Sequence, residues 1–459
     1  MKKSLIKIMS TIIGIGVISS IMPSKLFALE VKNYANKEAT EVIIFKDENF
    51  KRALIEQGVD INKDREIAIG EMAQVEKLFL LDEGIRDISG IEYATSLNWL
   101  TLSGNPIKDL TPIEGLNQLR GLYMSGSNLK NVESIGKLTN LLELNISDNP
   151  IRDISPIRNL TNLRVLQLIE CNLENLEWVG ELEELEILSL SGNLVEDINW
   201  IKGLTKLNRL ELNDCWLKDI TPLKDLTDLV HIEISNNPIQ SIEAIKGLSQ
   251  LERLHMWGGQ VSSIEALEGL TKLRMLNIGG NPVESISVLG KLQSLTSLTL
   301  WKCGITDIEC LKTLTDLKHL ALGNNDIENM EALSELKQLT SLYINDCKLM
   351  NIDFVSNFEN LQILDISENY LDVTQGSNTM KRIQTMIGRG VEVKFTPQLR
   401  RKEDVNYDGK IDYDDLEEVA QKYNTTEEDI KWDEKIDLNK DGKIDIFDFI
   451  IIATQFKSN

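Results

Sequence analysis

One pattern of apolar positions recurs along most of the chain. Three apolar residues stand at spacings of three and two, as in Leu97, Leu100 and Leu102, and an Asn and another apolar residue follow. The pattern L-x-x-L-x-L-x-x-N-x-I returns every 22 residues, without insertion or deletion, in fourteen copies from Val75 to Leu371. The three core positions of every copy hold Val, Leu, Ile or Met, so this is an internal repeat. A single copy cannot bury its own leucines, and stacked copies form a continuous core.

These motifs resemble the leucine-rich repeat family, and the 22-residue length is similar to that of internalins. The resemblance implies an α/β leucine-rich repeat right-handed solenoid over residues 75–371. Each L-x-x-L-x-L segment is then a short strand of a parallel sheet on the concave side. The return segment carries one turn of irregular or 3₁₀ structure on the convex side. In this family the Asn side chain bonds the backbone of adjacent coils from inside the turn.

The Asn position alternates with Cys or a small residue. The column reads Asn105, Ser127, Asn149, Cys171, Asn193, Cys215, Asn237, Gly259, Asn281, Cys303, Asn325, Cys347 and Asn369. Cys suits such a buried turn because it is small and a weak hydrogen-bond donor. Neighbouring Cys lie two coils apart, roughly 9.5 Å at the usual strand spacing, which exceeds disulfide reach. We therefore predict free, buried and unreactive thiols, and the fifth, Cys310, is expected to pack on the convex side.

Both ends of the repeat need a cover, because the outer faces of the end coils would otherwise be exposed. We predict an N-terminal linker and cap over residues 29–74, with a helix at Phe45–Gln57. A C-terminal cap is predicted over residues 372–398, with a helix from about Thr379 to Ile387 and a strand at Val391–Phe395. These elements would close the first and the last coil.

The N-terminal cap contains the spacing of a calcium-binding EF-hand loop. Asp60, Asn62, Asp64 and Glu71 stand at the first, third, fifth and twelfth places. However, Arg65 occupies the sixth place, where the loop needs Gly for a sharp turn. This departure favours a turn that stabilises the cap, and calcium binding is the alternative.

A second motif occurs twice in residues 399–459, as D-x-N-x-D-G-x-I-D-x-x-D, each time followed by an amphipathic segment (Leu416–Tyr423 and Phe449–Phe456). Oxygens at places 1, 3 and 5 reach one hard cation, place 7 gives its carbonyl, place 9 acts through water and place 12 gives a carboxylate. Gly at place 6 allows the chain to reverse. We predict two calcium ions, one held by Asp404, Asn406, Asp408, Lys410, Asp412 and Asp415, and the other by Asp437, Asn439, Asp441, Lys443, Asp445 and Asp448.

The paired loops resemble a type I dockerin, a small all-α calcium-binding domain. The resemblance implies docking to a cohesin domain. The positions that contact cohesin in that family are Tyr413-Asp414 in one half and Ile446-Phe447 in the other. Because the two halves differ there, symmetric docking in two orientations is in doubt. An intramolecular cap and a different class of cohesin stay open as alternatives.

The side chains at the x positions of each strand face solvent, because strand side chains alternate. All three His of the chain fall there, and Trp257 and Trp301 share one column, with Gly279 and Gly323 in the alternate coils. Exposed Trp, Arg and His are typical of binding hot spots. We predict a ligand-binding surface on the concave face formed by His231, Arg253, His255, Trp257, Arg274, Trp301, Lys302 and His319. The alternative is a scatter of aromatic residues that a solenoid face tolerates.

The N-terminus predicts export from the cell. Three Lys precede an apolar run from Ile8 to Met22, and Ala28 offers a cleavage point, as in a secretory signal peptide over residues 1–28. The run is short for a spanning helix, and an uncleaved membrane anchor is the alternative. No second apolar run of spanning length occurs. We expect a monomer that is secreted or attached to the cell surface through a scaffold, with no membrane span after cleavage.

Composition narrows the functional classes. Hydrophobic residues make up 42% of the 459, which excludes wholesale disorder. The net charge of −23 leaves no basic groove for nucleic acid. No GxGxxG, P-loop, HExxH or GxSxG motif occurs. The ladder cysteines are buried and the histidines exposed, so no thiol meets a base, and the His spacing disfavours a structural zinc site.

We predict a secreted, non-enzymatic binding or adhesion protein. Its concave face would bind a protein partner, and its calcium-loaded dockerin-like module would dock to a cohesin-bearing scaffold. The alternative is a carbohydrate-binding accessory component of a polysaccharide-degrading complex, with Trp257 and Trp301 stacking on sugar rings.

Overall fold

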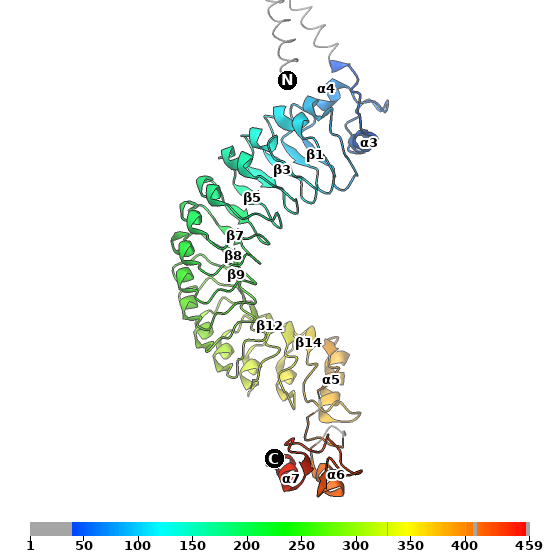
Figure 1. Ribbon diagram of the computed structural model, residues 1–459, viewed down its shortest axis with the longest axis vertical. Helices are drawn as coiled ribbons and strands as arrows, with labels where there is room; N and C mark the ends of the chain where they lie inside the picture. Colours follow the sequence, from blue (N-terminus) through cyan, green and yellow to red (C-terminus); the bar gives the residue numbers. More distant parts are fainter. Residues whose placement is uncertain (1–38, 328, 400, 407–410, 456–459) are drawn as a thin grey trace, which may run out of the picture. The chain divides into compact units, whose positions relative to one another are not determined.

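The computed structural model (Figure 1) describes residues 39–327, 329–399, 401–406 and 411–455. The chain forms two compact units, residues 1–239 with 243–251 and residues 240–242 with 252–459. The predicted signal peptide lies outside the described residues. Within the described ranges, no helix is long and apolar enough to cross a membrane.

Fourteen short strands occupy the predicted core segments of the repeats. Neighbouring strands are parallel and in register within each unit, so that Leu78 pairs with Leu100 and Leu276 with Leu298. Within each unit the strands follow chain order. Their bounds are β1 Lys77–Phe79, β2 Trp99–Thr101, β3 Gly121–Tyr123, β4 Glu143–Asn145, β5 Val165–Gln167, β6 Ile187–Ser189, β7 Arg209–Glu211, β8 His231–Glu233, β9 Arg253–His255, β10 Met275–Asn277, β11 Ser297–Thr299, β12 His319–Ala321, β13 Ser341–Tyr343 and β14 Ile363–Asp365.

The return segments carry short 3₁₀-helices, on the side of each coil opposite its strand (Figure 1). Their bounds are η1 Ile91–Tyr93, η2 Thr111–Gly115, η3 Ile135–Lys137, η4 Ser155–Asn159, η5 Glu177–Glu181, η6 Asn199–Gly203, η7 Thr221–Asp225, η8 Glu243–Ile245, η9 Glu265–Leu267, η10 Ser287–Lys291, η11 Glu309–Thr313, η12 Glu331–Glu335 and η13 Asp353–Asn357. The predicted fold class, a leucine-rich repeat solenoid, is confirmed.

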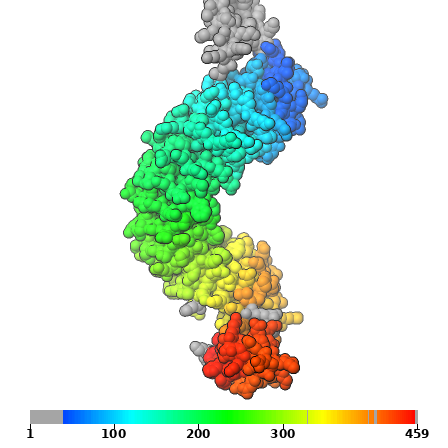
Figure 2. Space-filling view, viewed as in Figure 1, coloured from blue at the N-terminus to red at the C-terminus, as the bar shows by residue number. Residues whose placement is uncertain are grey.

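The repeat leucines form the core between the sheet and the 3₁₀-helices. The central residue of a strand is buried, as is the apolar residue of the 3₁₀-helix that follows, for example Leu100 and Ile113. In the space-filling view, the surfaces of successive coils within each unit lie against one another (Figure 2). Each coil thus buries its leucines against the next, as the repeat predicts.

The Asn column joins neighbouring coils by hydrogen bonds. Asn149 is buried, and its Nδ2 donates to the carbonyl of Met124 in the preceding coil at 2.8 Å and to that of Ile146 at 2.9 Å. Its Oδ1 accepts from the backbone N–H groups of Ser127 and Leu129, at 3.0 and 2.8 Å. One side chain therefore satisfies backbone groups of two coils that would otherwise be buried without partners.

Cysteine takes four of the alternate places in this column, and these four thiols and that of Cys310 are all free. The backbone N–H of Cys171 donates to Oδ1 of Asn193, and its Sγ donates to the carbonyl of Ile146, 3.3 Å away. Four of the five are buried, as predicted. Cys310 is half-buried on the convex side, where its Sγ contacts the carbonyl of Ile286 at 3.1 Å.

Helices cover the two ends of the repeats. Upstream, α3 (Glu48–Glu56) buries Phe50 and Leu54, and the short α4 (Ile69–Met72) leads into β1. Downstream, α5 (Asn378–Gly388) precedes β15 (Glu392–Lys394), which pairs with β14 in parallel. The predicted cap helices and the closing strand are present.

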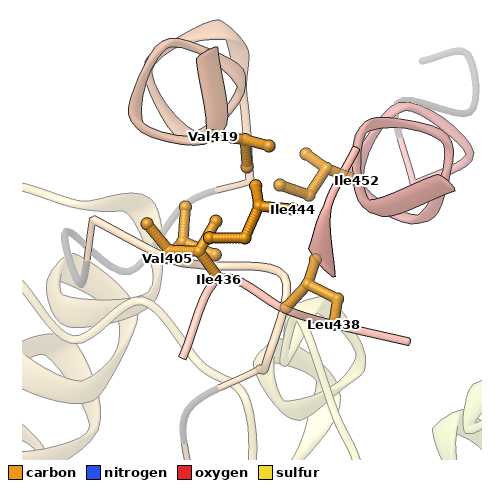
Figure 3. Close-up of a cluster of buried hydrophobic side chains, with 6 residues drawn as sticks. All are labelled: Val405, Val419, Ile436, Leu438, Ile444 and Ile452. Carbon is orange, nitrogen blue, oxygen red and sulfur yellow. The ribbon is translucent and has the colours of Figure 1, made fainter. Parts of the chain in front are cut away.

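The C-terminal module is built on two helices, α6 (Tyr413–Lys422) and α7 (Ile446–Ala453). Each helix begins three residues before its predicted start, because Asp412 and Asp445 act as N-caps. The sequence predicts an all-α module, but the structure also contains a short antiparallel pair of strands, β16 (Thr425–Thr426) and β17 (Lys443–Ile444). A small apolar core joins these elements (Figure 3), formed by Val405, Val419, Ile436, Leu438, Ile444 and Ile452.

Candidate calcium loops and concave binding surface

The loop from Asp437 to Asp448 is fully described, and its side chains are fixed by backbone N–H groups. Asp437 accepts from the N–H of Asp441 at 3.2 Å and from that of Gly442 at 2.9 Å. Asp448 is fully buried, and its two oxygens accept from Leu438 and Asp445, each at 2.8 Å. Backbone N–H groups thereby hold the side chains at the first and twelfth places of the loop.

The donor set of this loop fits a calcium ion. In the described part of the chain, no three His, Cys, Asp or Glu side chains converge closely enough to hold a metal. An EF-hand loop does not depend on such a trio, because an Asn side chain and a backbone carbonyl complete the shell. Here Asn439 and the carbonyl of Lys443 would supply these oxygens beside Asp437, Asp441 and Asp448. Hard oxygen donors of this kind favour calcium over softer metals.

The first loop shows the same arrangement where it is described. Asp415 is fully buried and accepts from the N–H of Asp412 at 2.8 Å and from that of Asn406 at 3.3 Å. Burial raises the pKa of Asp415, and the charge of Asp404 adds to the rise. A divalent cation would offset both effects. The predicted ligands Asp408 and Lys410 lie outside the described residues.

Apolar side chains surround the start of α7 on the protein surface. Ile446 is 52% exposed, Phe447 58% and Ile450 47%. At the start of α6, the corresponding position is Tyr413, which is 79% exposed. The two halves of the module therefore present different surfaces, and the one on α7 is the more apolar.

On the concave face of the second unit, each predicted Trp lies over a glycine of the next coil. A Cβ added at Gly279 would lie 2.8 Å from Cδ1 of Trp257, and one at Gly323 would lie 2.9 Å from Cδ1 of Trp301. Trp257 is 39% exposed. The glycines thus give each indole the room that the alternation of the column predicts, and any side chain there would displace it.

Basic side chains accompany these indoles in the same unit. Nζ of Lys302 lies 6.0 Å from the ring centre of Trp301. His319 contacts the hydroxyl of Ser341, with 3.2 Å between Nδ1 and Oγ. Arg253 and Arg274 are exposed and His255 is half-buried. Seven of the eight predicted surface residues therefore belong to one unit.

The eighth, His231, belongs to the first unit and takes part in a charged network there. Its Nε2 lies 2.9 Å from Oε1 of Glu233. Glu211 on the neighbouring strand is only 8% exposed, and its carboxylate contacts Ser189 at 2.7 Å and Nε of Arg209 at 2.5 Å. The sequence-based prediction missed Glu211, Arg209 and Glu233. A signal was present, since three charged residues occupy x positions of two successive strands.

A stacked aromatic pair lies nearer the start of the same unit. The rings of Trp99 and Tyr123 are 5.2 Å apart with 26° between their planes. The Tyr123 hydroxyl donates to Glu143 on the next strand. Burial, and after it this carboxylate, raise the pKa of Tyr123 well above its ordinary value, so the hydroxyl stays protonated.

Comparison with known proteins agrees with both parts of this architecture. Residues 293–349 match the leucine rich repeat family, and residues 402–457 match the dockerin type I domain. No curated protein matches the chain significantly.

Solved structures share the fold of the repeats. An internalin from Listeria monocytogenes has 29% identity and a TM-score of 0.60, over 77% of this chain and 97% of its own. A leucine-rich repeat protein from Leptospira interrogans has 22% identity and a TM-score of 0.61, over 71% and 97%. The functional domain of another Listeria monocytogenes internalin, described as including a cysteine ladder, has 20% identity and a TM-score of 0.55, over 81% and 74%. The chain therefore has a leucine-rich repeat solenoid similar to that of an internalin, followed by a segment that matches the dockerin type I domain.

Proposed function

We propose that this chain is a non-catalytic binding protein that works outside the cell, attached to a cohesin-bearing scaffold by its dockerin domain. The observation that carries the proposal is the pair of loops in which buried Asp415 and Asp448 are held by backbone N–H groups. Two calcium ions would hold both loops in their docking conformation. The match to the dockerin type I domain supports the same role.

The apolar surface on α7 is the proposed contact with the cohesin. Exposed Ile446, Phe447 and Ile450 offer a nonpolar patch at the start of α7, which suits the apolar core of a protein interface. The α6 end presents Tyr413 followed by Asp414 instead. Docking through α7 in one orientation follows from this asymmetry.

Calcium titration of the full chain tests the metal sites. Asp404→Ala combined with Asp437→Ala removes the first ligand of both loops, and the titration should lose two equivalents of bound ion. Glu434→Gln is the matched control, because it removes one charge from an exposed side chain next to the second loop. If the double variant bound as many ions as the parent chain, the calcium part of the proposal would be wrong.

The concave face of the second unit is proposed to bind a protein partner. Trp257 and Trp301, with Lys302 beside the second indole, combine aromatic area with positive charge. Trp is one of the side chains that contribute most to the binding free energy of protein interfaces. The rest of the sheet supplies a broad surface over which the weaker contacts can spread.

A polysaccharide is the second candidate ligand, favoured by the repeated placement of an indole over a glycine. Binding to insoluble glucans and to cell-surface protein extracts separates the two candidates. Trp257→Ala with Trp301→Ala should abolish binding to the true ligand, and Trp216→Ala is the control, because this 63% exposed indole lies in a turn of the first unit. Glucan binding that survives in the double variant would exclude the proposed stacking of sugar rings on Trp257 and Trp301.

A further inference from the structure

The loop between α3 and α4 in the N-terminal cap shares most of its hydrogen bonds with the second dockerin loop. In both loops the N–H at the sixth place donates to the Asp at the first, Arg65 to Asp60 and Gly442 to Asp437, each at 2.9 Å. In both, the third-place Asn accepts from the fifth-place N–H, at 2.8 Å in the cap and 3.0 Å in the dockerin. Two segments in different units therefore share one loop conformation.

The twelfth place shows the same agreement. Oε1 of Glu71 accepts from the N–H groups of Ile61 and Asn62, at 2.9 and 3.2 Å, and Oε2 accepts from Ala68 at 2.9 Å. In the dockerin loop Asp448 binds the corresponding three N–H groups, at 2.8, 3.3 and 2.8 Å. Glu is one carbon longer than Asp, and it is the residue that binds calcium through both oxygens in EF-hand loops.

Arginine at the sixth place does not prevent the sharp turn. Arg65 adopts a φ of 68°, in the left-handed region that Gly442 occupies with a φ of 82°. A side chain at that angle costs roughly 1 kcal/mol relative to glycine. The backbone N–H of Arg65 still makes the bond that closes the loop. Arg65, whose presence at the sixth place disfavours calcium binding by the sequence rule, therefore has the left-handed conformation that the loop requires.

One carboxylate oxygen of Asp60 has no hydrogen-bond partner among the described residues, which leaves a place for a cation. Oδ1 of Asp60 is buried and has no hydrogen-bond partner among the described residues. The other oxygen of this carboxylate, Oδ2, accepts the N–H of Arg65 across the loop. A buried carboxylate oxygen without a partner is costly. In the dockerin loop, by contrast, both oxygens of Asp437 accept N–H groups.

We propose that the cap loop from Asp60 to Glu71 is a third calcium site of this chain. Asp60, Asn62, Asp64 and Glu71 supply side-chain oxygens and Glu66 supplies its backbone carbonyl. The ion takes the place of the missing partner of Asp60. None of these residues belongs to the dockerin domain or to the concave surface.

The site is coupled to the cover of the first coil. Ile67, at the eighth place of the loop, is fully buried, and its carbonyl accepts the N–H of Ile43 at 2.9 Å. On the other side of the loop, the N–H of Val59 donates to the carbonyl of Leu54 in α3 at 3.0 Å. Calcium bound here holds α3 and α4 together and stabilises the cap by mass action.

Calorimetric titration of the full chain carrying Asp404→Ala and Asp437→Ala tests the site. In this background, with the dockerin loops disabled, one equivalent of calcium should still bind, and adding Glu71→Gln should abolish it. Glu66→Gln is the matched control, because it removes the same charge from the same loop but leaves the carbonyl in place. Its side chain forms an exposed ion pair with Lys51 at 2.7 Å.

If the chain with Asp404→Ala and Asp437→Ala bound no calcium while the parent chain bound two ions, the third site would be wrong and the two dockerin sites would be supported. A parent chain that binds a single ion, lost with Glu71→Gln, would support the third site and contradict the dockerin sites. Arg65→Gly guards against a variant that fails to fold, since Gly adopts a positive φ without strain. It should bind calcium several-fold more tightly than the background, and loss of binding in a folded Arg65→Gly variant would also overturn the proposal.

Discussion

The carboxylate of Asp47 links the start of helix α3 to the backbone of Arg86, 39 residues later. Oδ2 accepts the N–H of Arg86 at 2.7 Å and that of Asp87 at 3.2 Å. Oδ1 accepts from Asn49 and Phe50 in the first turn of α3, at 2.9 and 3.2 Å. One side chain therefore caps the helix and fastens it to the first repeat.

Asp47→Ala should loosen the N-terminal cap. Loss of the helix cap costs about 1 to 2 kcal/mol, and the bonds to residues 86 and 87 are lost as well. Hydrogen exchange of the α3 amides should become faster, while exchange in the dockerin domain stays unchanged. Asp47→Asn keeps one acceptor oxygen, so its exchange rates should lie between those of the parent chain and those of Asp47→Ala. Equal exchange in all three would contradict the role given to this residue.

The same carboxylate should make the stability of the cap depend on pH. Burial by itself raises the pKa of Asp47, but four backbone N–H donors outweigh it and hold the pKa below the ordinary value of 3.8. Its contribution is then fully present above pH 3.8 and is lost as the pH falls through the lower, folded-state value. The free energy of unfolding of the cap can be measured in urea by hydrogen exchange at a series of pH values. As the pH falls, this free energy should decrease more steeply in the parent chain than in Asp47→Ala. Parallel curves would refute this.

Substitution of an Asn in the Asn column should destabilise the chain far more than substitution of a Cys between two of these Asn residues. Asn237→Ala leaves the N–H groups of Cys215 and Leu217 and the carbonyl of Leu212 without partners, and should cost at least about 3 kcal/mol. Cys171→Ser should change stability by less than about 1 kcal/mol, because Ser127 already donates from the same place to the preceding coil. Chemical denaturation compares the two variants. A larger loss for Cys171→Ser would contradict the ladder.

The five thiols should be unreactive in the folded chain. Burial raises the pKa of Cys171, Cys215 and Cys303 to about 11 and that of Cys347 to about 12. At Cys310, burial and the charge of Asp307 raise the pKa to about 11. At pH 8 the thiolate fraction is on the order of one in a thousand. Iodoacetamide at pH 8 should label no Cys before unfolding and all five afterwards, as counted by mass spectrometry.

The sequence predicts most of this fold, because one 22-residue period sets the position of every strand and turn of the repeats. Leu100 and Asn149 each occupy the place that the repeat assigns to them. The nesting of Trp257 over Gly279 also follows from the column alone. In a parallel sheet with a constant period, residues of one column are neighbours, so the pattern carries the three-dimensional arrangement.

The parts that depend on individual side-chain directions could not be predicted. The buried Glu211 is tolerated only because Ser189 and Arg209 turn toward it, and no spacing rule encodes that contact. In the cap loop, Arg65 breaks the expected pattern, yet its backbone adopts the angle of a glycine. The rule for the sixth place names glycine because glycine adopts a positive φ at the lowest cost. Another residue can adopt the same angle when the surrounding structure holds the backbone there.

Calcium-dependent binding to cohesin domains tests the central claim most directly. The full chain should bind at least one member of a panel of type I cohesins in the presence of calcium, and release it when a chelator is added. Asp404→Ala with Asp437→Ala should abolish this binding, and Phe447→Ser should weaken it at least tenfold. Binding that persists in the chelator and in the double variant would contradict the account, as would a folded, calcium-loaded chain that binds no cohesin of the panel.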